Sequence, residues 1–433
     1  MAAGTRTDAA AAYAAAQRQA HDERARLTIA FAAFILIGVN DGVIGVLLPS
    51  IIAHYQISTA TVGLLFPASS IGYLCAAFNS GFLLERLGRR AFLAGGALVW
   101  IAGMLVFALL PPFPALLPAL FAIGFGVAIL DAGLNAYIAG LPRGVSLLNY
   151  LHAFYGVGAL LGPLLATVML TSVFGWNATY VALALGVTAA VVGIALSFER
   201  RRLANYPTHA AAGEAAGEAA GEAAGELATG HGLLRATLRS PLVWFCAIFL
   251  LVYVGVEVSL GAWSYTLLTG GRHIPTLLAG WMISGYWFGL TLGRFLLARV
   301  VERVGPRRAI QWLTVGVVVG IALVWAPAGA GAGMDGGTGT ALTAVGLWLV
   351  GFSLGPIFPS VIAVINAVTS ARLRQSAIGF AASLGSMGGA FFPWVAAILA
   401  QRLGLWSLLP YTAALTLIML ALWLWLRTRL RTT

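Results

Sequence analysis

Long apolar runs recur along the whole chain and constrain its fold more than any other feature. A helix that crosses a bilayer needs about 20 mainly apolar residues. Twelve such runs lie near residues 27–54, 60–83, 91–110, 114–140, 147–173, 176–197, 242–269, 275–299, 308–328, 340–367, 374–400 and 406–427. Only 9% of the 433 residues are charged, whereas a soluble domain carries about 25%. We therefore predict an all-α membrane protein with twelve transmembrane helices.

The placement of arginine predicts the orientation in the membrane. All 25 basic residues are Arg, and 22 of them fall in the two terminal tails or in loops on the same side as those tails. The loops on the other side hold only Arg272 and Arg402, and Arg294 lies within span eight. Cationic loops stay cytoplasmic. We therefore expect both termini to face the cytoplasm, with the protein in the cytoplasmic (plasma) membrane, and the net charge of +11 does not indicate nucleic-acid binding.

A change in composition divides the chain into two halves of six spans each. After Phe198 the sequence becomes charged and then repeats the tetrapeptide A-A-G-E over residues 211–226. The first 26 residues lack the apolar core and cleavage site of a signal peptide. We predict a cytoplasmic N-terminal tail at 1–26, a six-helix half at 27–197, a cytoplasmic Ala/Gly/Glu linker at 198–241, a second six-helix half at 242–427 and a cytoplasmic C-terminal tail at 428–433.

The two halves also resemble each other in sequence. The pattern E-R-x-G-x-R at 85–90 aligns with E-R-x-G-x-R-R at 302–308 when the second half is shifted by 217 positions. Two further pairs align at a shift of 216, namely Asp41 with Glu257 and Gly45 with Gly261. Pseudo-symmetric halves with a site at their shared midplane suit a machine that rocks around a central solute. The duplication argues against an enzyme.

Ionisable side chains inside the predicted spans are the main candidates for function. They are Asp41, Asp131, His152, Glu257 and Arg294. A charge at the bilayer centre costs about 2.5–3.5 kcal/mol on insertion scales, so such residues usually face a cavity and serve function. A carboxyl group in a dry cavity is harder to ionise than one in water and can exchange protons near neutral pH. We predict proton coupling at Asp131, Asp41 and Glu257; the alternative is that these acids only hydrogen-bond neighbouring helices.

Polar and aromatic residues near these acids are candidates for solute binding. Asn40 and Asn135 could hydrogen-bond a polar solute, or could join helices to one another. Aromatic side chains could stack on a sugar ring or an amphipathic ligand, or could simply pack against lipid. The predicted binding set is Asp41, Asn40, Asn135, Glu257, Trp263 and Tyr286. His152 and Arg294 lie nearer the predicted cytoplasmic ends of their spans. They could act in gating; alternatively, Arg294 could extend to the membrane interface and His152 could simply be hydrogen-bonded within the protein.

The loop after span two, G-x-x-x-E-R-x-G-R-R at 81–90, resembles the signature of the major facilitator superfamily between helices two and three, with Glu where Asp is usual. The resemblance extends from span one to span twelve. It implies a twelve-helix transporter in which Glu85, Arg86 and Arg89 control conformation. We add to this conformational gate Arg90, Glu302, Arg303, His152 and Arg294.

A narrower likeness is to the fucose–proton symporter branch. Asn40-Asp41 in span one and D-A-G-L-N-A-Y-I at 131–138 in span four are similar to that branch, whose span-four pattern is acid-T-A-A-N-P-Y-I. The resemblance implies proton coupling at Asp131 and sugar recognition at Asp41. Here Asp replaces the usual Glu, and Ala136 replaces the usual Pro. Few Asn and no central Gln are available for a hexose, which needs many bidentate hydrogen-bonding partners.

These observations favour a proton-coupled secondary transporter that moves a small neutral, sugar-like solute by alternating access. The alternative is a proton-driven efflux antiporter for an amphipathic compound, because G-A-L-L-G-P at 158–163 partly resembles the antiporter signature of drug exporters. A membrane enzyme, a lipid scramblase and a sensor are less favoured. Cys75 and Cys246 lie far apart and suggest neither a disulfide nor a metal site. The expected partners are a small-molecule substrate, protons and membrane lipid, with no nucleic acid, metal or cofactor, and the protein is expected to be a monomer.

Overall fold

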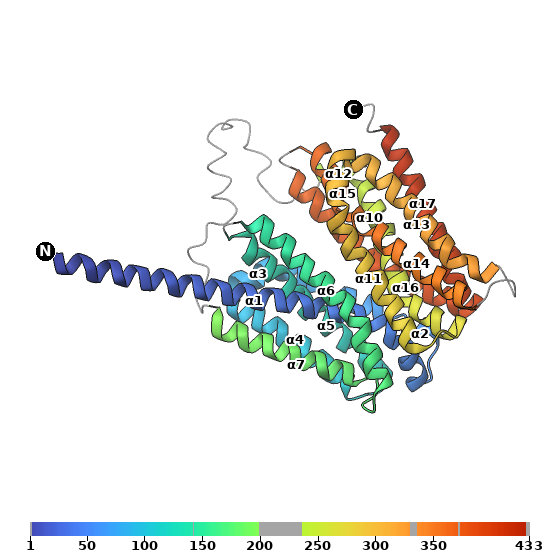
Figure 1. Cartoon of the computed structure of the whole chain (residues 1–433), viewed down its shortest axis with the longest axis horizontal. Helices are drawn as coiled ribbons and strands as arrows, with labels where there is room; N and C mark the ends of the chain where they lie inside the picture. The colour runs from blue at the N-terminus through green and yellow to red at the C-terminus, as the bar shows by residue number, and fades with distance from the viewer. Residues whose placement is uncertain (1, 142, 199–235, 330–335, 371–372, 430–433) are drawn as a thin grey trace.

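The computed structural model describes residues 2–141, 143–198, 236–329, 336–370 and 373–429, which are almost entirely helical (Figure 1). Most of the predicted Ala/Gly/Glu linker, residues 199–235, and most of the predicted C-terminal tail, residues 430–433, lie outside the described residues. Each of the twelve predicted spans corresponds to one helix or to a pair of consecutive helices. The predicted all-α architecture of twelve transmembrane helices is therefore confirmed.

The bounds of the helices follow the chain in two sets. The first half contains α1 (Ala2–Tyr55), α2 (Thr59–Val62), α3 (Leu65–Leu87), α4 (Arg89–Ala108), α5 (Leu116–Ala139), α6 (Gly144–Thr171) and α7 (Ala178–Ser197). The second half contains α10 (Pro241–Thr266), α11 (Thr276–Leu296), α12 (Ala298–Val304), α13 (Pro306–Gly329), α14 (Gly336–Leu354), α15 (Ile357–Val368), α16 (Arg374–Leu403) and α17 (Leu408–Arg429). Spans two and ten are each built from two helices, α2 with α3 and α14 with α15.

Helix α1 is much longer than the predicted first span. It begins at Ala2, so the predicted tail of residues 1–26 continues the helix of span one, and this extension projects away from the rest of the molecule (Figure 1). Alanine has the highest helix propensity, and the extension is rich in it. The 54-residue length of α1 thus combines a membrane span with an Ala-rich extension.

Eleven helices in the described ranges are long and apolar enough to cross a membrane. The remaining predicted span is α11, a helix of 21 residues that carries Arg294 together with several aromatic and glycine residues. These residues lower its hydropathy without shortening it, and about 20 residues suffice to cross the hydrocarbon core. We therefore count α11 as the twelfth span.

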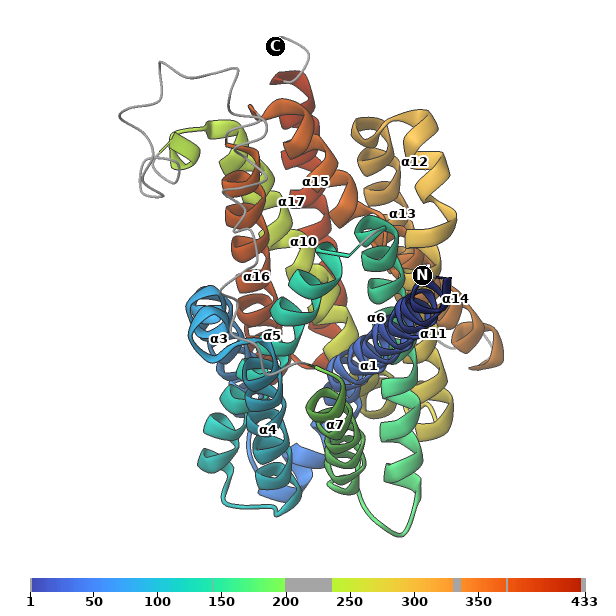
Figure 2. The same ribbon diagram turned by 90° about the vertical axis from the view of Figure 1, so that its left-hand side faces the viewer.

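Packing between helices repeats from one half to the other. In the first half α1 packs on α6, α3 on α5, and α4 on both α5 and α7. In the second half α10 packs on α16, α11 on α14, and α13 on both α14 and α17. The halves meet where α6 lies beside α11, α3 beside α16 and α1 beside α10 (Figure 2). The predicted pseudo-symmetry is thus present in the helix pairing as well as in the sequence.

Glycine permits the closest of these contacts. A Cβ atom on Gly42 of α1 would lie 2.7 Å from the Ala159 carbonyl oxygen of α6, and one on Gly162 would lie 2.6 Å from the Val39 carbonyl oxygen. Small residues at such crossings let two backbones approach closely. The helices α1 and α6 therefore form one tightly packed pair in the first half.

The aligned E-R-x-G motifs fold alike. Gly88 ends α3 with φ 77°, and Gly305 ends α12 with φ 86°. Both values lie in the left-handed region that glycine adopts at little cost. The repeated motif therefore makes the same turn in each half.

Alternation of the spans places the described chain ends on one side, called here the terminal side, and the α1–α2 and α16–α17 connections on the other, called the opposite side. On the opposite side the halves touch: the Ala60 backbone N–H donates to Gln401 Oε1 at 2.9 Å. Gly63 packs there against Ala397 and Trp394 of α16. The two halves are therefore joined directly on the opposite side.

Candidate functional site

A cavity of about 440 Å³ lies between the two halves. Its wall is built from α1, α3, α5, α6 and α7 of the first half and from α10, α11 and α16 of the second. The five ionisable residues that the sequence placed inside spans all line it, namely Asp41, Asp131, His152, Glu257 and Arg294. The structure thus brings together, from five helices, side chains that are up to 253 positions apart in the sequence.

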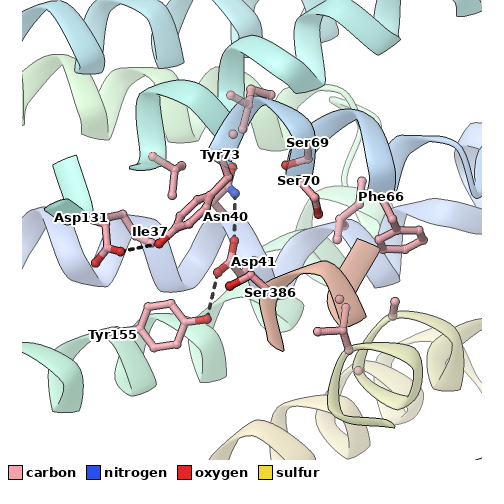
Figure 3. A pocket seen from close by; sticks show the side chains of 18 of the residues that line it. Ile37, Asn40, Asp41, Phe66, Ser69, Ser70, Tyr73, Asp131, Tyr155 and Ser386 are labelled. Atoms are coloured by element: carbon pink, nitrogen blue, oxygen red, sulfur yellow. Dashed lines mark hydrogen bonds between the residues drawn. The ribbon is translucent and has the colours of Figure 1, made fainter. Parts of the chain in front are cut away.

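Asp41 projects from α1 into the cavity, where its side chain accepts hydrogen bonds on both oxygens (Figure 3). The Tyr155 hydroxyl of α6 donates to Oδ2 at 2.9 Å, and the Asn40 amide donates to Oδ1 at 3.2 Å. Asn40 is itself held by Trp100 of α4, whose Nε1–H donates to its Oδ1 at 3.3 Å. The Asp41 carboxylate is therefore positioned by neutral donors.

Asp131 of α5 has a similar pattern of neutral donors. The Tyr73 hydroxyl of α3 donates to Oδ2 at 2.6 Å (Figure 3). The Asn135 amide, one turn further along α5, donates to Oδ1 at 2.8 Å and to the Asp131 backbone oxygen at 2.9 Å. His152 of α6 lies within electrostatic range of this carboxyl group. Asp131 and Asp41 thus each pair with one tyrosine and one asparagine.

Glu257 of α10 has a different partner. The Arg294 Nη2 of α11 lies 3.7 Å from Glu257 Oε1. Arg294 also donates from Nε to the Gly355 carbonyl oxygen at 3.2 Å, where α14 gives way to α15. Because Asp41 and Asp131 form no salt bridge with any described residue, the cavity has one acid in the second half that is paired with a cation and two in the first half that are not.

Most of the remaining wall is apolar, with a small group of hydroxyls. Ser69 and Ser70 of α3 and Ser386 of α16 line the cavity beside Asp41, and Phe66 lies one turn along α3 (Figure 3). The apolar lining residues include Phe34, Ile37, Ile44, Leu65, Ile123, Val127, Val254 and Val258. The cavity therefore offers hydrogen-bonding groups within a largely apolar enclosure.

Three predicted binding residues are not among those that line the cavity, and they contact residues of the surrounding helices. Asn135 holds Asp131 as described above. Trp263 is buried, and its Nε1–H donates to the Pro393 carbonyl oxygen at 2.9 Å. Tyr286 is buried too, and its hydroxyl donates to the Glu257 backbone oxygen at 2.8 Å. Direct contact of these residues with a solute remains a prediction, and the cavity geometry does not favour it.

Several lining residues were absent from the predicted site, namely Ser69, Ser70, Tyr73, Tyr155 and Ser386. Tyrosine and serine are common within apolar spans, and nothing in their local sequence distinguishes a cavity-facing hydroxyl from one that packs between helices. A helical spacing does connect the α3 residues, because positions 66, 69, 70 and 73 fall on one face. That signal could have identified α3 as a wall of the cavity.

The predicted conformational gate lies on the terminal side, away from the cavity apart from His152 and Arg294. Glu85 and Arg86 are exposed, and the Arg86 guanidinium lies 5.7 Å from the centre of the Phe82 ring. The Arg89 guanidinium lies 5.1 Å from the centre of the Tyr137 ring of α5. Arg90 is half-buried, and Glu302 and Arg303 are exposed on α12. A role of these residues in conformational change remains a prediction.

Known proteins resemble the chain in sequence over most of its length. Bypass of stop codon protein 6 from Saccharomyces cerevisiae is 25% identical over 413 residues, which cover 90% of this chain and 79% of the yeast protein. The putative niacin/nicotinamide transporter NiaP from Bacillus subtilis is 24% identical over 401 residues, which cover 89% and 91% of the two chains. The similarity therefore extends across both halves.

Solved structures share the fold. A bacterial homolog to the human lysosomal transporter Spinster, in an inward-facing and unoccupied conformation, matches with a TM-score of 0.76 at 16% identity, covering 94% of this chain and 97% of that chain. A D-xylose-proton symporter matches with a TM-score of 0.72 at 15% identity, covering 91% and 96%. Residues 30–277 and 261–433 match the family described as Major Facilitator Superfamily. With that match over nearly the whole chain, and with two pseudo-symmetric halves enclosing one cavity, the protein belongs to the major facilitator superfamily of membrane transporters.

Proposed function

We propose that the protein is a proton-coupled secondary transporter that moves a small neutral, sugar-like solute by alternating access. The observation that carries the proposal is the unequal pairing of the three cavity acids. Asp41 and Asp131 have only neutral donors, whereas Glu257 has Arg294. Charges without a partner inside a membrane are costly, and binding a proton is the simplest way to remove that cost.

Asp131 is the better proton site, and Asp41 the better solute site. Both Asp131 oxygens already accept hydrogen bonds from Tyr73 and Asn135, and its side chain is only half-exposed. Asp41 is more exposed and stands beside the serine hydroxyls. Protonation of Asp131 would remove a charge from the cavity wall and permit the halves to close around the solute. Glu257, also predicted to couple protons, would first have to give up its ion pair with Arg294.

The chemistry of the wall supports a hydroxylated solute. A carboxylate and an amide at Asp41 and Asn40, with the hydroxyls of Ser69, Ser70 and Ser386, can each exchange hydrogen bonds with solute hydroxyl groups. Phe66 offers a ring face next to them. The likeness of span four to the fucose–proton symporter branch and the fold shared with a D-xylose-proton symporter point in the same direction.

The cellular placement is part of the proposal. The loops on the terminal side carry nearly all of the arginines, and cationic loops remain in the cytoplasm. We place the protein in the plasma membrane with both termini cytoplasmic. The terminal side is then the cytoplasmic side, and the contact between Ala60 and Gln401 closes the external side.

Proteoliposomes that contain the full chain test the proposal. Radiolabelled D-xylose, L-fucose and D-glucose would be offered with and without an inward proton gradient. We expect the gradient to drive uphill uptake of at least one sugar, and Asp131→Asn to abolish that uptake while counterflow exchange survives. Uphill uptake retained by Asp131→Asn would remove Asp131 from proton coupling, and absence of any proton-linked sugar movement would remove the sugar.

A second candidate is a proton-driven efflux antiporter for an amphipathic compound. The observation in its favour is the largely apolar wall around the polar groups, which suits a ligand with one apolar face. The sequence similarity to the putative niacin/nicotinamide transporter NiaP makes nicotinamide a suitable probe. Movement of protons against the solute, seen as a pH change of opposite sign in loaded vesicles, would favour this candidate over symport.

A further inference from the structure

One face of α3 carries both a contact to Asp131 and hydroxyl groups that line the cavity. Phe66, Ser69, Ser70 and Tyr73 all line the cavity, and their spacing of three, four and seven positions places them on one helical face. Among the described residues, no hydrogen bond occupies the Ser69 or Ser70 hydroxyl. Tyr73 ends this row where α3 meets Asp131. The row therefore connects the Asp131 carboxyl group with the region beside Asp41.

The phenol of Tyr73 has a single proton to donate. In the structure that proton is directed to Asp131 Oδ2, at a distance of 2.6 Å between the two oxygens. An ionised carboxylate only accepts hydrogen bonds, whereas a protonated one carries an O–H donor. When Asp131 takes up a proton on Oδ2, its new O–H can donate to the Tyr73 oxygen. The Tyr73 proton, which stays on the phenol, is then free to point into the cavity.

Other groups face Asp131 and contribute to its titration. His152 of α6 lies within electrostatic range, and His152 in turn lies within range of Arg294 of α11. Asp41 of α1 interacts with the Asp131 carboxylate through its charge. Asn135 donates to the other oxygen of Asp131 from the same helix. Of these groups, only Tyr73 both contacts the Asp131 carboxyl group and shares a helix face with Ser69 and Ser70.

We propose that Tyr73 is the positioning residue that links proton binding at Asp131 to solute binding at the α3 face. Proton uptake by Asp131 turns the Tyr73 hydroxyl from a donor committed to the carboxylate into a donor available to the solute. Each ligand then strengthens the binding of the other, because coupling between two sites is reciprocal. This inference rests on the proposed function for its account of solute binding, but its first step concerns the protein and the proton alone.

Infrared titration of the purified full-length protein in lipid tests that first step without any solute. The carboxylic acid C=O band that disappears in Asp131→Asn reports protonation of this side chain. Tyr73→Phe removes a hydrogen bond that favours the ionised carboxylate, so the midpoint of the band should move up by about one pH unit. Tyr180→Phe removes a hydroxyl from the α7 wall of the same cavity and should leave the midpoint in place. An unchanged midpoint in Tyr73→Phe would overturn the inference.

Counterflow of D-xylose at several pH values tests the second step. In the wild type the apparent affinity should rise as Asp131 becomes protonated, and in Tyr73→Phe this rise should be lost while exchange continues. Asn135→Ala removes the other donor to Asp131 but does not touch the α3 face. It should move the midpoint and keep the rise in affinity, which a merely structural role of Tyr73 would not predict. A pH-dependent affinity retained in Tyr73→Phe would contradict the linkage.

The two steps separate failure of this inference from failure of the proposed function. If D-xylose is not transported but the Asp131 band still responds to Tyr73→Phe, the proposed solute is wrong and the contact between Tyr73 and the proton site stands. If D-xylose uptake is proton-driven but neither the band nor the affinity responds to Tyr73→Phe, the role of Tyr73 is wrong and the transport function stands.

Discussion

Gly45 of α1 lies directly against Gly261 of α10, so that a Cβ atom on Gly45 would stand 2.8 Å from the Gly261 carbonyl oxygen. These two glycines are the pair that the internal repeat aligns at a shift of 216. Equivalent residues of two pseudo-symmetric halves can touch only near the axis that relates the halves. Asp41 and Glu257, one turn before each glycine, therefore stand on either side of this axis at the cavity.

Close contact at this axis makes Gly45 sensitive to the smallest side chain. In Gly45→Ala the new methyl group would lie 2.7 Å from the Ala262 carbonyl oxygen and 2.8 Å from its Cα, so the halves must separate. Overpacking of this kind costs about 1–3 kcal/mol, and we expect transport to fall by about five- to 150-fold while the protein still folds. Gly285→Ala is the matched control, because its methyl group would meet no atom within 4 Å.

Labelling from each side measures the conformational effect of Gly45→Ala. A cysteine at the cavity-lining position Ile44, in a Cys75→Ser background, would react with a membrane-impermeant maleimide. Separation of the halves should increase labelling from the opposite side relative to the terminal side. Wild-type labelling and wild-type transport in Gly45→Ala would show that this contact does not limit the conformational change.

The ion pair between Arg294 and Glu257 predicts a specific pattern of stability. Arg294→Gln leaves the Glu257 carboxylate in the cavity without a cation. We expect this variant to lower the free energy of unfolding by about 3 kcal/mol at most. The Arg294 side chain is 31% exposed, so solvent partly screens its charge. Glu257→Gln with Arg294→Gln removes both charges and should lower the melting temperature in detergent less than Arg294→Gln alone. Equal melting temperatures for the single and double variants would mean that the two charges do not stabilise each other.

Much of the fold could be predicted from the sequence, because each membrane span is marked by its own continuous apolar run. The need to satisfy every backbone polar group within lipid forces an apolar run to form a helix, and the repeat predicts that the two halves fold alike. The same reasoning placed Asp41, Asp131 and Glu257 at a central cavity, because ionisable groups inside spans usually face one. The structure adds His152 and Arg294 to the same cavity wall.

The finer details of the site depend on how each helix is rotated about its axis and on how deep each residue lies in the membrane. The apolar runs encode neither. Tyr73 and Tyr155 belong to the site because their hydroxyls reach carboxylates on other helices, which no local sequence pattern indicates. Trp263 and Tyr286 have the composition of a binding site, yet their polar atoms are taken up by backbone carbonyl oxygens. Which acid pairs with Arg294 is equally a matter of three-dimensional packing.

Loss of the Tyr155 hydroxyl should change the affinity for the solute and leave proton binding at Asp131 nearly unchanged. Its hydroxyl donates to Asp41 Oδ2 at 2.9 Å, and a hydrogen bond to a charged group contributes about 1.5–3 kcal/mol. Tyr155→Phe leaves Asp41 without one of its two orienting donors, so the apparent affinity in counterflow should fall by about tenfold or more. The pH midpoint assigned to Asp131 should change little. A full shift of that midpoint, with unchanged affinity, would reverse the roles given to the two acids.

The Gln401 side chain should stabilise the form that is closed on the opposite side. Its Oε1 accepts a hydrogen bond from the Ala60 backbone N–H at 2.9 Å, across the boundary between the halves. A neutral hydrogen bond contributes about 0.5–1.5 kcal/mol, so Gln401→Ala should favour the form open on the opposite side by about two- to twelvefold. Gln401→Glu keeps an acceptor at the same place and should stay close to the wild type. The Ile44→Cys labelling ratio reports both variants, and an equal ratio in Gln401→Ala and the wild type would show that closure does not depend on this bond.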